Sequence, residues 1–368
     1  MIKAQKIEEV KKAHMDSFNW KACRIPFGIW VNDKSKYNEI SYDDPDFDKK
    51  LFERQMTIVE DTVKIGSDLI PVLGITNYGI AIVPSLFGAE MRGSSYDVDK
   101  IEEMGYWIKK KFINIEDVDN FHTPEIESEF LDGVIAHIEY YKENKPESVM
   151  LSNSLDGPFS IAEVLRGADL YYDIYDKPEY VHKLMDLCTD VIIRCEKKLR
   201  KVAGYCEEAD EFPTYFGIWA PGLRFGDDSI INLSEEMIRE FVIPYYKKIA
   251  KSFKCKVEIH FCSVNRPIGE QVLKAFVDCN EVVGISTQLG TELYGKYLGT
   301  IKDKLSIEAG YGDALKYHID QYVDFKKWAL NLKENLNGDS GLILYTTVNS
   351  LDDAKKLWSA WNEVWSKK

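Results

Sequence analysis

The sequence has no apolar segment long enough to cross a membrane. Its longest apolar runs, such as residues 79–89, fall well short of the roughly 20 residues that a spanning helix needs. The first residues, Met1–Lys21, are charged and amphipathic and contain no apolar core of the kind found in signal peptides. The seven cysteines are odd in number and scattered, which favours reduced thiols over a disulfide framework. We therefore expect a cytoplasmic protein that does not insert into membranes.

Positive charge is also scarce. The chain has 47 Lys and Arg against 61 Asp and Glu, a formal net charge of −14, and nine of its 368 residues are arginines. Phosphate binding needs a basic face, so nucleic acid and anionic membrane surfaces are disfavoured as partners. Arginine is the usual side chain that binds carboxylates, so the small number of arginines disfavours a substrate with many carboxylates. A small-molecule substrate fits this composition better.

Linkers rich in Pro, Gly or Ser, internal repeats and a Gly-rich phosphate fingerprint are all missing as well. The missing fingerprint disfavours an open dinucleotide-binding sheet. What recurs instead is a short β-rich run followed by a long amphipathic stretch, which predicts a (β/α)8 TIM-type barrel over residues 21–368 after an N-terminal helical extension over residues 1–20. The predicted strands cover 24–30, 68–75, 148–155, 215–220, 256–261, 282–287, 305–309 and 342–346. The predicted helices cover 47–64, 126–144, 178–201, 234–252, 268–276, 322–335 and 351–365.

His260 and Cys262 are the most informative residues of the chain. His260 lies in the predicted strand 256–261, and Cys262 comes directly after its last residue. Residues at positions i and i+2 of a strand point to the same face, so both side chains should share one face. An imidazole and a thiol aimed at one point form half of a soft-metal site. The alternative is a hydrogen-bonded histidine near a buried thiol, because free cysteine is among the most buried residue types.

Active-site groups of a barrel come from the C-terminal ends of its strands, and polar or aromatic residues follow most of the predicted strands. From these we predict that Asp227, Asp228 and His260 are catalytic, although Gly-Asp is also common turn chemistry. The predicted substrate-binding residues are Asn153, Asp156, Trp219, Tyr78 and Tyr311.

Three stretches of the chain resemble the uroporphyrinogen decarboxylase superfamily, which includes the decarboxylase and the corrinoid-dependent methyltransferases of the same fold. Residues 155–162, continuing through 165–167 and 173–179, resemble the family's Gly-Pro-Phe-Thr segment and the helix after it. Residues 226–228, 233–237 and 241–245 are similar to its Asp-Asp turn and Ser-Pro-Glu helix start, and residues 259–263 resemble its His-x-Cys-Gly. The resemblance runs in register from about residue 65 to the C-terminus, and it implies the same barrel.

The resemblance favours the methyltransferase branch. The decarboxylase grips its substrate with an N-terminal motif rich in arginine, whereas residues 24–32 contain one arginine, and residues 76–79 contain no carboxylate where its essential aspartate stands. The methyltransferases hold zinc through His-x-Cys and a distant cysteine. His260 and Cys262 match the first two ligands, but residues 344–347 contain no cysteine.

The implied third ligand is therefore another residue. Asp228, Glu308 and Cys206 are the candidates, and we assign Glu308 to the predicted metal set because it ends a strand. Zinc held by three protein ligands leaves a position open for a substrate thiol or oxygen. The corrinoid, as methylcobalamin, is expected on a separate protein that docks at the barrel mouth, because this chain has no Asp-x-His-x-x-Gly motif to ligate cobalt.

Two other functions stay open on the sequence. One is a metal-free ligand-binding or accessory barrel, favoured by the missing third cysteine and by Ser263 in place of the family's glycine. The other is a decarboxylase-like lyase on a different substrate, with Asp227 or Asp228 as the working carboxylate. The sequence does not predict the oligomeric state or the methyl donor and acceptor.

Overall fold

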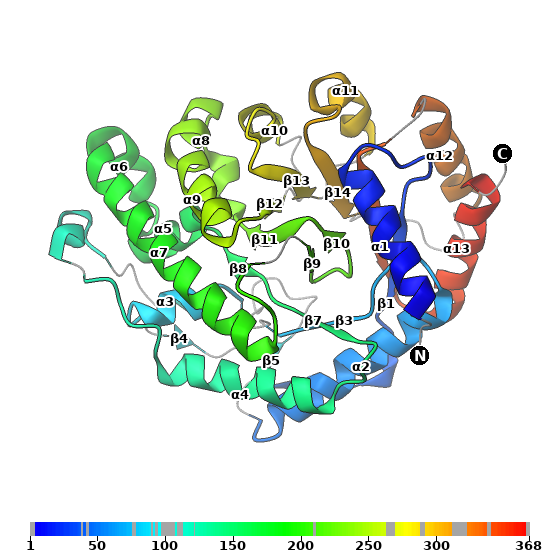
Figure 1. The fold of residues 1–368 in the computed structure, drawn as a ribbon, viewed down its shortest axis with the longest axis horizontal. Helices are drawn as coiled ribbons and strands as arrows, with labels where there is room; N and C mark the ends of the chain where they lie inside the picture. Colours follow the sequence, from blue (N-terminus) through cyan, green and yellow to red (C-terminus); the bar gives the residue numbers. More distant parts are fainter. Residues whose placement is uncertain are drawn as a thin grey trace.

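The computed structural model describes residues 4–37, 40–41, 44–75, 79–89, 91–92, 95–96, 107–108, 113–120, 122–208, 211–262, 269–287, 291–310, 322–336 and 340–365. Strands and helices alternate along the chain, with the helices outside the strands (Figure 1). The helices are α1 (Ala4–Phe18), α2 (Phe47–Ile65), α3 (Ile82–Leu86), α4 (Glu129–Asn144), α5 (Pro158–Arg166), α6 (Leu170–Asp176), α7 (Pro178–Ala203), α8 (Glu235–Phe241), α9 (Ile243–Phe253), α10 (Glu270–Phe276), α11 (Thr291–Ile301), α12 (Tyr322–Asn335) and α13 (Leu351–Trp365).

The strands and helices follow the (β/α)8 arrangement that the sequence predicts, with β7 and β8 as two consecutive parts of one predicted strand. One sheet has the order β1-β15-β14-β13-β12-β11-β8, in which every pair is parallel, and β3 and β7 form a separate parallel pair. The N–H groups of Phe27 and Ile29 on β1 donate to the side chains of Asp68 and Ser67, just before β3, and the Asp68 N–H donates to the Phe27 carbonyl, so hydrogen bonds connect the two sheets. The strands are β1 (Phe27–Val31), β3 (Val72–Gly74), β7 (Met150–Ser152), β8 (Leu155–Asp156), β11 (Gly222–Gly226), β12 (Lys256–Phe261), β13 (Val282–Thr287), β14 (Ser306–Gly310) and β15 (Leu342–Val348).

The helices begin and break where the sequence chemistry requires. The Ser234 side chain accepts the Met237 N–H at the start of α8, and Pro178 occupies the first turn of α7. The single helix predicted over 234–252 is wrong, because the chain forms α8 and α9 with a break at Val242. Pro244 explains the break, since proline has no N–H and crowds the preceding turn.

The strand predicted over 215–220 is also wrong. A short antiparallel hairpin of β9 (Phe212–Pro213) and β10 (Trp219–Ala220) occupies this region, and the barrel strand is β11 at Gly222–Gly226. Gly222 has φ +141°, and a Cβ there would overlap the backbone carbonyl of Lys256 on β12. A glycine is required for this close strand pairing. Glycine is uncommon in strand interiors, so its presence weakened the strand signal in the sequence.

The hairpin tip and helix α1 close the end of the barrel where the strands begin. The Phe216 ring stacks on Tyr345 of β15 with 4.5 Å between centroids, and the Arg224 guanidinium lies 5.1 Å from the same ring. On α1, buried His14 accepts the Trp219 N–H at Nδ1 and donates from Nε2 to the Asp68 carbonyl, both at 3.0 Å. Among the described residues, access for a ligand is therefore left at the opposite end of the barrel, where the exposed Asp228 lies.

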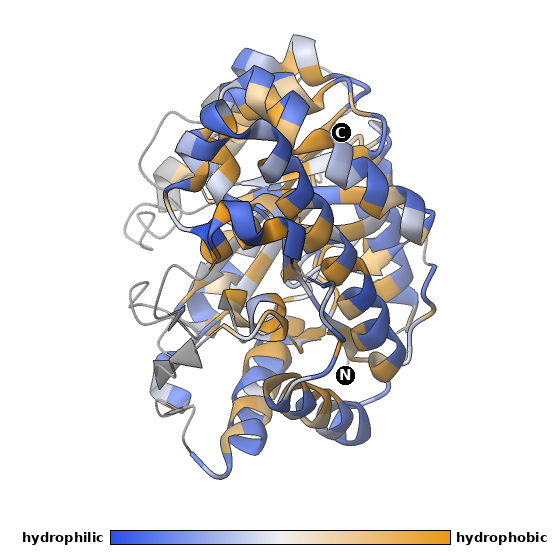
Figure 2. Cartoon of the chain, turned by 90° about the vertical axis from the view of Figure 1, so that its left-hand side faces the viewer, coloured by the Kyte–Doolittle hydropathy of each residue, from blue (hydrophilic) through white to orange (hydrophobic). Residues whose placement is uncertain are grey.

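The helices bury their apolar faces against the strands and turn their polar faces outward (Figure 2). Aromatic packing is dense where α12 and α13 meet β1, with Phe27 and Trp361 rings 4.8 Å apart. No helix in the part of the chain that the structure describes is both long and apolar enough to span a bilayer.

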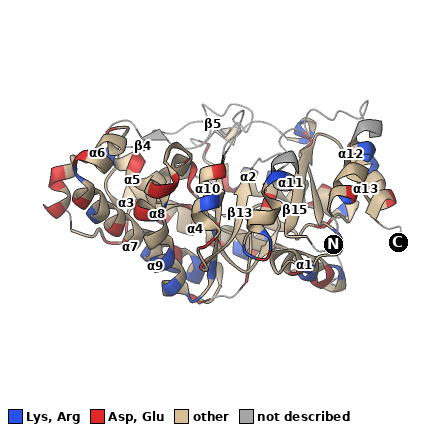
Figure 3. Ribbon diagram, turned by 90° about the horizontal axis from the view of Figure 1, so that it is seen from above, with Lys and Arg blue, Asp and Glu red and all other residues tan. Residues whose placement is uncertain are grey.

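Acidic and basic residues are distributed unevenly over the outer helices (Figure 3). Helix α8 begins with Glu235 and Glu236, close to the ends of the barrel strands, whereas Lys251 and Lys254 lie at the far end of α9. The side of the molecule near the strand ends is therefore the more acidic one on these two helices.

Candidate active site

The candidate site is built on a row of residues that are paired across five neighbouring strands. In register, Asp156 of β8 pairs with Gly226 of β11, Gly226 with His260 of β12, His260 with Ser286 of β13, and Ser286 with Glu308 of β14. Residues paired in register on parallel strands project to the same side of the sheet, and here that side is the barrel interior. The row thus collects a carboxyl, an imidazole, a hydroxyl and a second carboxyl, with Gly226 leaving space in the middle.

Two residues further along their strands, Asp228 and Cys262 join His260 at the open end. Among the described residues, these three form the one group of His, Cys, Asp and Glu side chains with metal-ligand spacing, and their ligand atoms all lie within 4.8 Å of one another. His260 Nε2 is 3.4 Å from Cys262 Sγ. Ligand atoms of a tetrahedral zinc ion are about 3.5 Å apart, so this pair already has the required separation.

The electrostatics of the pair favour a metal over a proton on the imidazole. Burial, together with the Arg224 charge, holds the pKa of His260 well below its ordinary value, so the ring is neutral. Burial and then Asp228 raise the pKa of the Cys262 thiol to about 12, which keeps it protonated in the protein without metal. A divalent cation displaces such a thiol proton, because coordination stabilises the thiolate.

Asp228 is fixed against Cys262 by the backbone. Its Oδ1 accepts the Cys262 N–H at 2.6 Å, and the side chain is exposed at the open end. The surrounding protein, which removes part of its hydration, raises the pKa of Asp228. A sulfur, a nitrogen and an oxygen donor in this arrangement form a ligand set typical of zinc.

Asp227 has a different environment. Its Oδ1 accepts the Ser160 N–H at 2.7 Å and its Oδ2 accepts the Tyr246 hydroxyl at 2.8 Å, and the side chain is fully buried. Ser160 lies in the first turn of α5, whose own N-cap residue, Gly157, has no side chain to cap it. Asp227 therefore caps α5 from a neighbouring strand end, and both of its oxygens are engaged.

Asp156 lies at the other end of the row from Glu308. Burial, followed by the charges of Asp228 and Asp227, raises its pKa to about 8. A carboxyl group with such a pKa keeps its proton near neutral pH and acts as a hydrogen-bond donor. In the row it is separated from His260 only by Gly226, where an added Cβ would contact just the Asp156 carboxyl at 3.5 Å.

Glu308 does not join the metal group, contrary to our assignment of it as the third ligand. It is fully buried, and its Oε1 accepts the Ser286 hydroxyl at 3.0 Å, while Ser286 lies between it and His260. Neighbouring strands are about 4.8 Å apart, so a side chain two strands away from His260 is roughly 10 Å distant at its base. Asp228 takes the position that we assigned to Glu308, and Cys206, exposed after α7, lies outside the group.

Two of the predicted substrate-binding residues lie elsewhere in the fold. The Asn153 amide donates at 2.6 Å to Glu196 of α7, so it faces the helix layer. Trp219 lies at the closed end, where Lys11 of α1 covers its ring at 4.2 Å. Its predicted place was wrong because the strand it was assigned to is the hairpin β9–β10. Tyr78 and Tyr311 lie outside the described residues.

Sequence reasoning missed the polar residues inside the barrel, Arg224, Glu258 and Ser286, and also Tyr246 of α9, which donates to Asp227. The signal was present for Glu258, because it precedes His260 and Cys262 on the same face of β12. No local sequence pattern identifies Ser286 and Arg224, because their proximity to His260 results from pairing between strands that are distant in the sequence.

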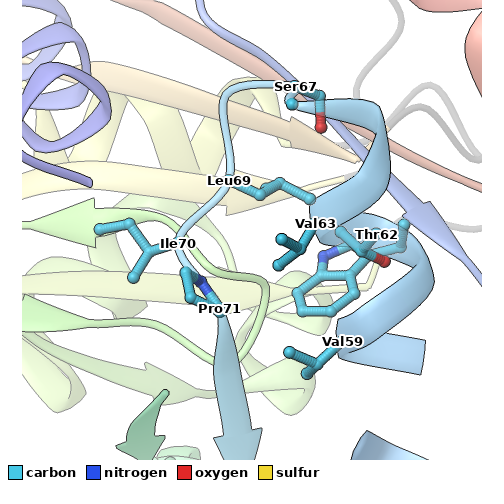
Figure 4. Close-up of a pocket in the computed structure, with 9 residues that line it drawn as sticks. Val59, Thr62, Val63, Ser67, Leu69, Ile70 and Pro71 are labelled. Carbon is cyan, nitrogen blue, oxygen red and sulfur yellow. The ribbon is translucent and has the colours of Figure 1, made fainter. Parts of the chain in front are cut away.

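An internal cavity between α2 and the segment before β3 is not a second site (Figure 4). Its lining is mostly apolar, and the hydroxyls of Thr62 and Ser67 accept backbone N–H groups of β1. It contains no acidic, imidazole or thiol group.

Comparison with known proteins finds a family model that matches part of the chain and a solved structure with a similar fold. Residues 74–205 match the model of the uroporphyrinogen decarboxylase (URO-D) family. A methyltransferase from Methanosarcina mazei has a similar structure, with a TM-score of 0.64 and 14% identity over 96% of this chain and 98% of that chain. A DUF72 family protein from Enterococcus faecalis matches with a TM-score of 0.24 and 11% identity over 68% of this chain and 84% of its own, too weak to support any inference. No curated protein matches the sequence.

Proposed function

We propose that the chain is a member of the uroporphyrinogen decarboxylase superfamily and acts as a zinc-assisted methyltransferase component. It would move a methyl group between a small molecule and a corrinoid carried by a separate protein. The observation that carries the proposal is the convergence of Asp228, His260 and Cys262 at the open end of the barrel. The likeness in fold to a methyltransferase supports the reaction class.

The three residues would hold the metal with one nitrogen, one sulfur and one oxygen. Bound there, zinc would supply a Lewis acid for a substrate thiol or oxygen at its fourth position. His260 contributes a neutral nitrogen, while Cys262 and Asp228 contribute negative charge. Asp156 holds a proton near neutral pH beside the space left by Gly226, where it can donate a hydrogen bond to a substrate oxygen.

The structure gives less support to a lyase that uses Asp227. Ser160 and Tyr246 occupy both oxygens of this buried carboxyl, so it is not free to contact a substrate. Asp227 serves instead to hold α5 beside the site.

Methyl transfer from free methylcobalamin to a small thiol tests the proposal. The reaction is followed by the change in visible absorbance of the corrinoid, with zinc content measured on the same samples. We expect the wild-type protein to bind one zinc ion and to transfer the methyl group, and His260→Ala and Cys262→Ala to lose both by at least about 100-fold.

Cys206→Ala is the matched control, because Cys206 is an exposed cysteine outside the metal group. It should keep both properties. Zinc content and transfer that survive in all three variants would exclude the proposed site. A wild-type protein that binds no zinc would favour the metal-free accessory barrel instead.

A further inference from the structure

We propose that Ser286, held by Glu308 and Arg224, is a positioning residue that fixes His260 in its Nδ1–H tautomer and so directs a bare Nε2 at Cys262 and Asp228. The inference rests on the proposed metal site, but it concerns residues to which neither the family match nor the fold assigns a role.

Ser286 hydrogen-bonds to four side chains inside the barrel, those of His260, Glu308, Arg224 and Tyr345. It is fully buried on β13, and its Oγ lies 3.1 Å from His260 Nδ1, 3.0 Å from Glu308 Oε1 and 3.3 Å from Arg224 Nη2. Ser286 and these three groups come from four parallel strands, β11 to β14, so the backbone of the sheet fixes their relative positions.

The donors and acceptors of the hydroxyl can be counted. A serine hydroxyl donates one hydrogen bond and accepts two. Arg224 can only donate, so it uses one acceptor position of Ser286 Oγ. The Tyr345 hydroxyl also bonds to Ser286. The single proton of the Ser286 hydroxyl therefore goes to Glu308, His260 or Tyr345.

Glu308 is the better acceptor. Its Oε1 lies nearer to Ser286 Oγ than His260 Nδ1 does. In the hydrogen bond between Ser286 and Glu308, the hydroxyl donates and the carboxyl oxygen accepts. The Ser286 proton therefore points to Glu308.

With that proton committed, His260 Nδ1 must donate to Ser286 Oγ. A neutral imidazole carries one ring proton, so Nε2 has none. Cys262 Sγ lies 3.4 Å from this nitrogen, while the thiol donates to the Asp228 carboxyl. The Nε2 lone pair is thereby already directed at the point where Cys262 and Asp228 converge. Such partners of ligating histidines usually matter for metal affinity.

The tautomer is measured by NMR on metal-free protein with ¹⁵N-labelled histidine. The chain has six histidines, so His260→Gln assigns the signal by its disappearance. We expect the His260 ring to carry its proton on Nδ1 in the wild-type protein. A ring protonated on Nε2 would overturn the proposal, whatever the variants do.

Zinc affinity, measured by competition with a chromophoric chelator, gives the second readout. Ser286→Ala should weaken zinc binding about 10- to 100-fold, and Ser286→Thr, which keeps the hydroxyl, should recover most of the loss. Ser306→Ala is the matched control, because Ser306 is a buried serine on β14 whose hydroxyl donates to the carbonyls of Ser17 and Phe18. It should bind zinc as the wild type does.

Equal zinc affinity in wild type and folded Ser286→Ala would contradict the proposal. If Ser286→Ala does not fold, the wild-type tautomer still decides. Both readouts are independent of methyl transfer: protein that shows the Nδ1–H tautomer but transfers no methyl group would overturn the proposed function and leave this inference standing.

Discussion

The surroundings of Asp156 determine its pKa and so whether the carboxyl keeps its proton. Burial and the nearby Asp228 and Asp227 raise its pKa to about 8, against an ordinary value of 3.8. Between those two values the unfolded chain loses the proton while the folded protein keeps it, so folding is favoured less as pH rises. The raised pKa therefore costs stability near neutral pH, and a cost of this kind is typical of active-site residues.

Replacing Asp156 with asparagine should remove that cost. Asparagine cannot ionise, so Asp156→Asn should stabilise the metal-free protein relative to wild type at pH 8 by at least about 2 kcal/mol more than at pH 4. Denaturant unfolding at both pH values in the presence of a chelator measures the difference. An equal effect of the substitution at pH 4 and pH 8 would show that the carboxyl is not held neutral.

Gly157 permits the close approach of α5 to the site. A Cβ at this position would overlap the Tyr246 hydroxyl and the Asp227 carboxyl, which bond to each other. We expect Gly157→Ala to destabilise the protein by roughly 1–3 kcal/mol through overpacking and to weaken zinc binding at the proposed site, because the strand end that carries Asp228 must move.

Gly133, on the exposed side of α4, is the matched control for this substitution. A Cβ there meets nothing within 4 Å, so Gly133→Ala should be neutral or stabilise by up to about 1 kcal/mol, as expected for a helix interior. Urea unfolding of both variants tests the pair. Similar changes in the free energy of unfolding for the two variants would show that a Cβ at Gly157 fits without overpacking, which would contradict the prediction.

At the scale of elements, α1 depends on a buried histidine. His14 bonds to both Trp219 and Asp68, and burial lowers its pKa from 6.5 to about 4. As pH falls below 6.5 the unfolded chain takes up a proton that the folded protein does not, so stability falls with pH. Wild type should lose about 2 kcal/mol more than His14→Gln between pH 7 and pH 5.

Thermal or denaturant unfolding at the two pH values measures this loss, and hydrogen exchange locates it. Amide exchange should rise first in α1 and the β9–β10 hairpin. A pH dependence that is the same in His14→Gln as in wild type would assign the acid sensitivity to other groups.

The sequence predicted the elements best where local chemistry decides them. The helices over 322–335 and 351–365 and the strands over 256–261 and 282–287 are confirmed to the residue, because strong hydrophobic alternation and clear start signals define their ends. Strand β11 was missed because its glycines and Arg224 hide an apolar pattern. The break at Val242 was missed because the apolar period continues across Pro244.

The site was partly predictable for the same reason. His260 and Cys262 share a face of one strand, so their proximity follows from local geometry. Asp228 could not be placed without knowing that Gly226 pairs with His260, which depends on strand register across distant segments. The same register puts Ser286 between His260 and Glu308, and no local pattern reports that.

At the scale of the whole molecule, the barrel should not depend on metal for its fold. The strands and helices bury one extensive apolar core, and the metal group lies at its edge. Removal of zinc should leave the far-ultraviolet circular dichroism unchanged. Zinc at 100 times its dissociation constant should raise the free energy of unfolding by about 2.7 kcal/mol through binding alone. Loss of secondary structure on chelation would contradict this.

The central claim is that Asp228, His260 and Cys262 together bind a catalytic zinc ion. A crystal structure of zinc-loaded protein, with anomalous data collected on both sides of the zinc edge, tests it most directly. We predict one zinc ion bound by an Asp228 oxygen, His260 Nε2 and Cys262 Sγ, with a non-protein ligand in the fourth position and Glu308 still bonded to Ser286. Zinc bound by Glu308 or Cys206 instead, or no anomalous signal at these three residues, would contradict it.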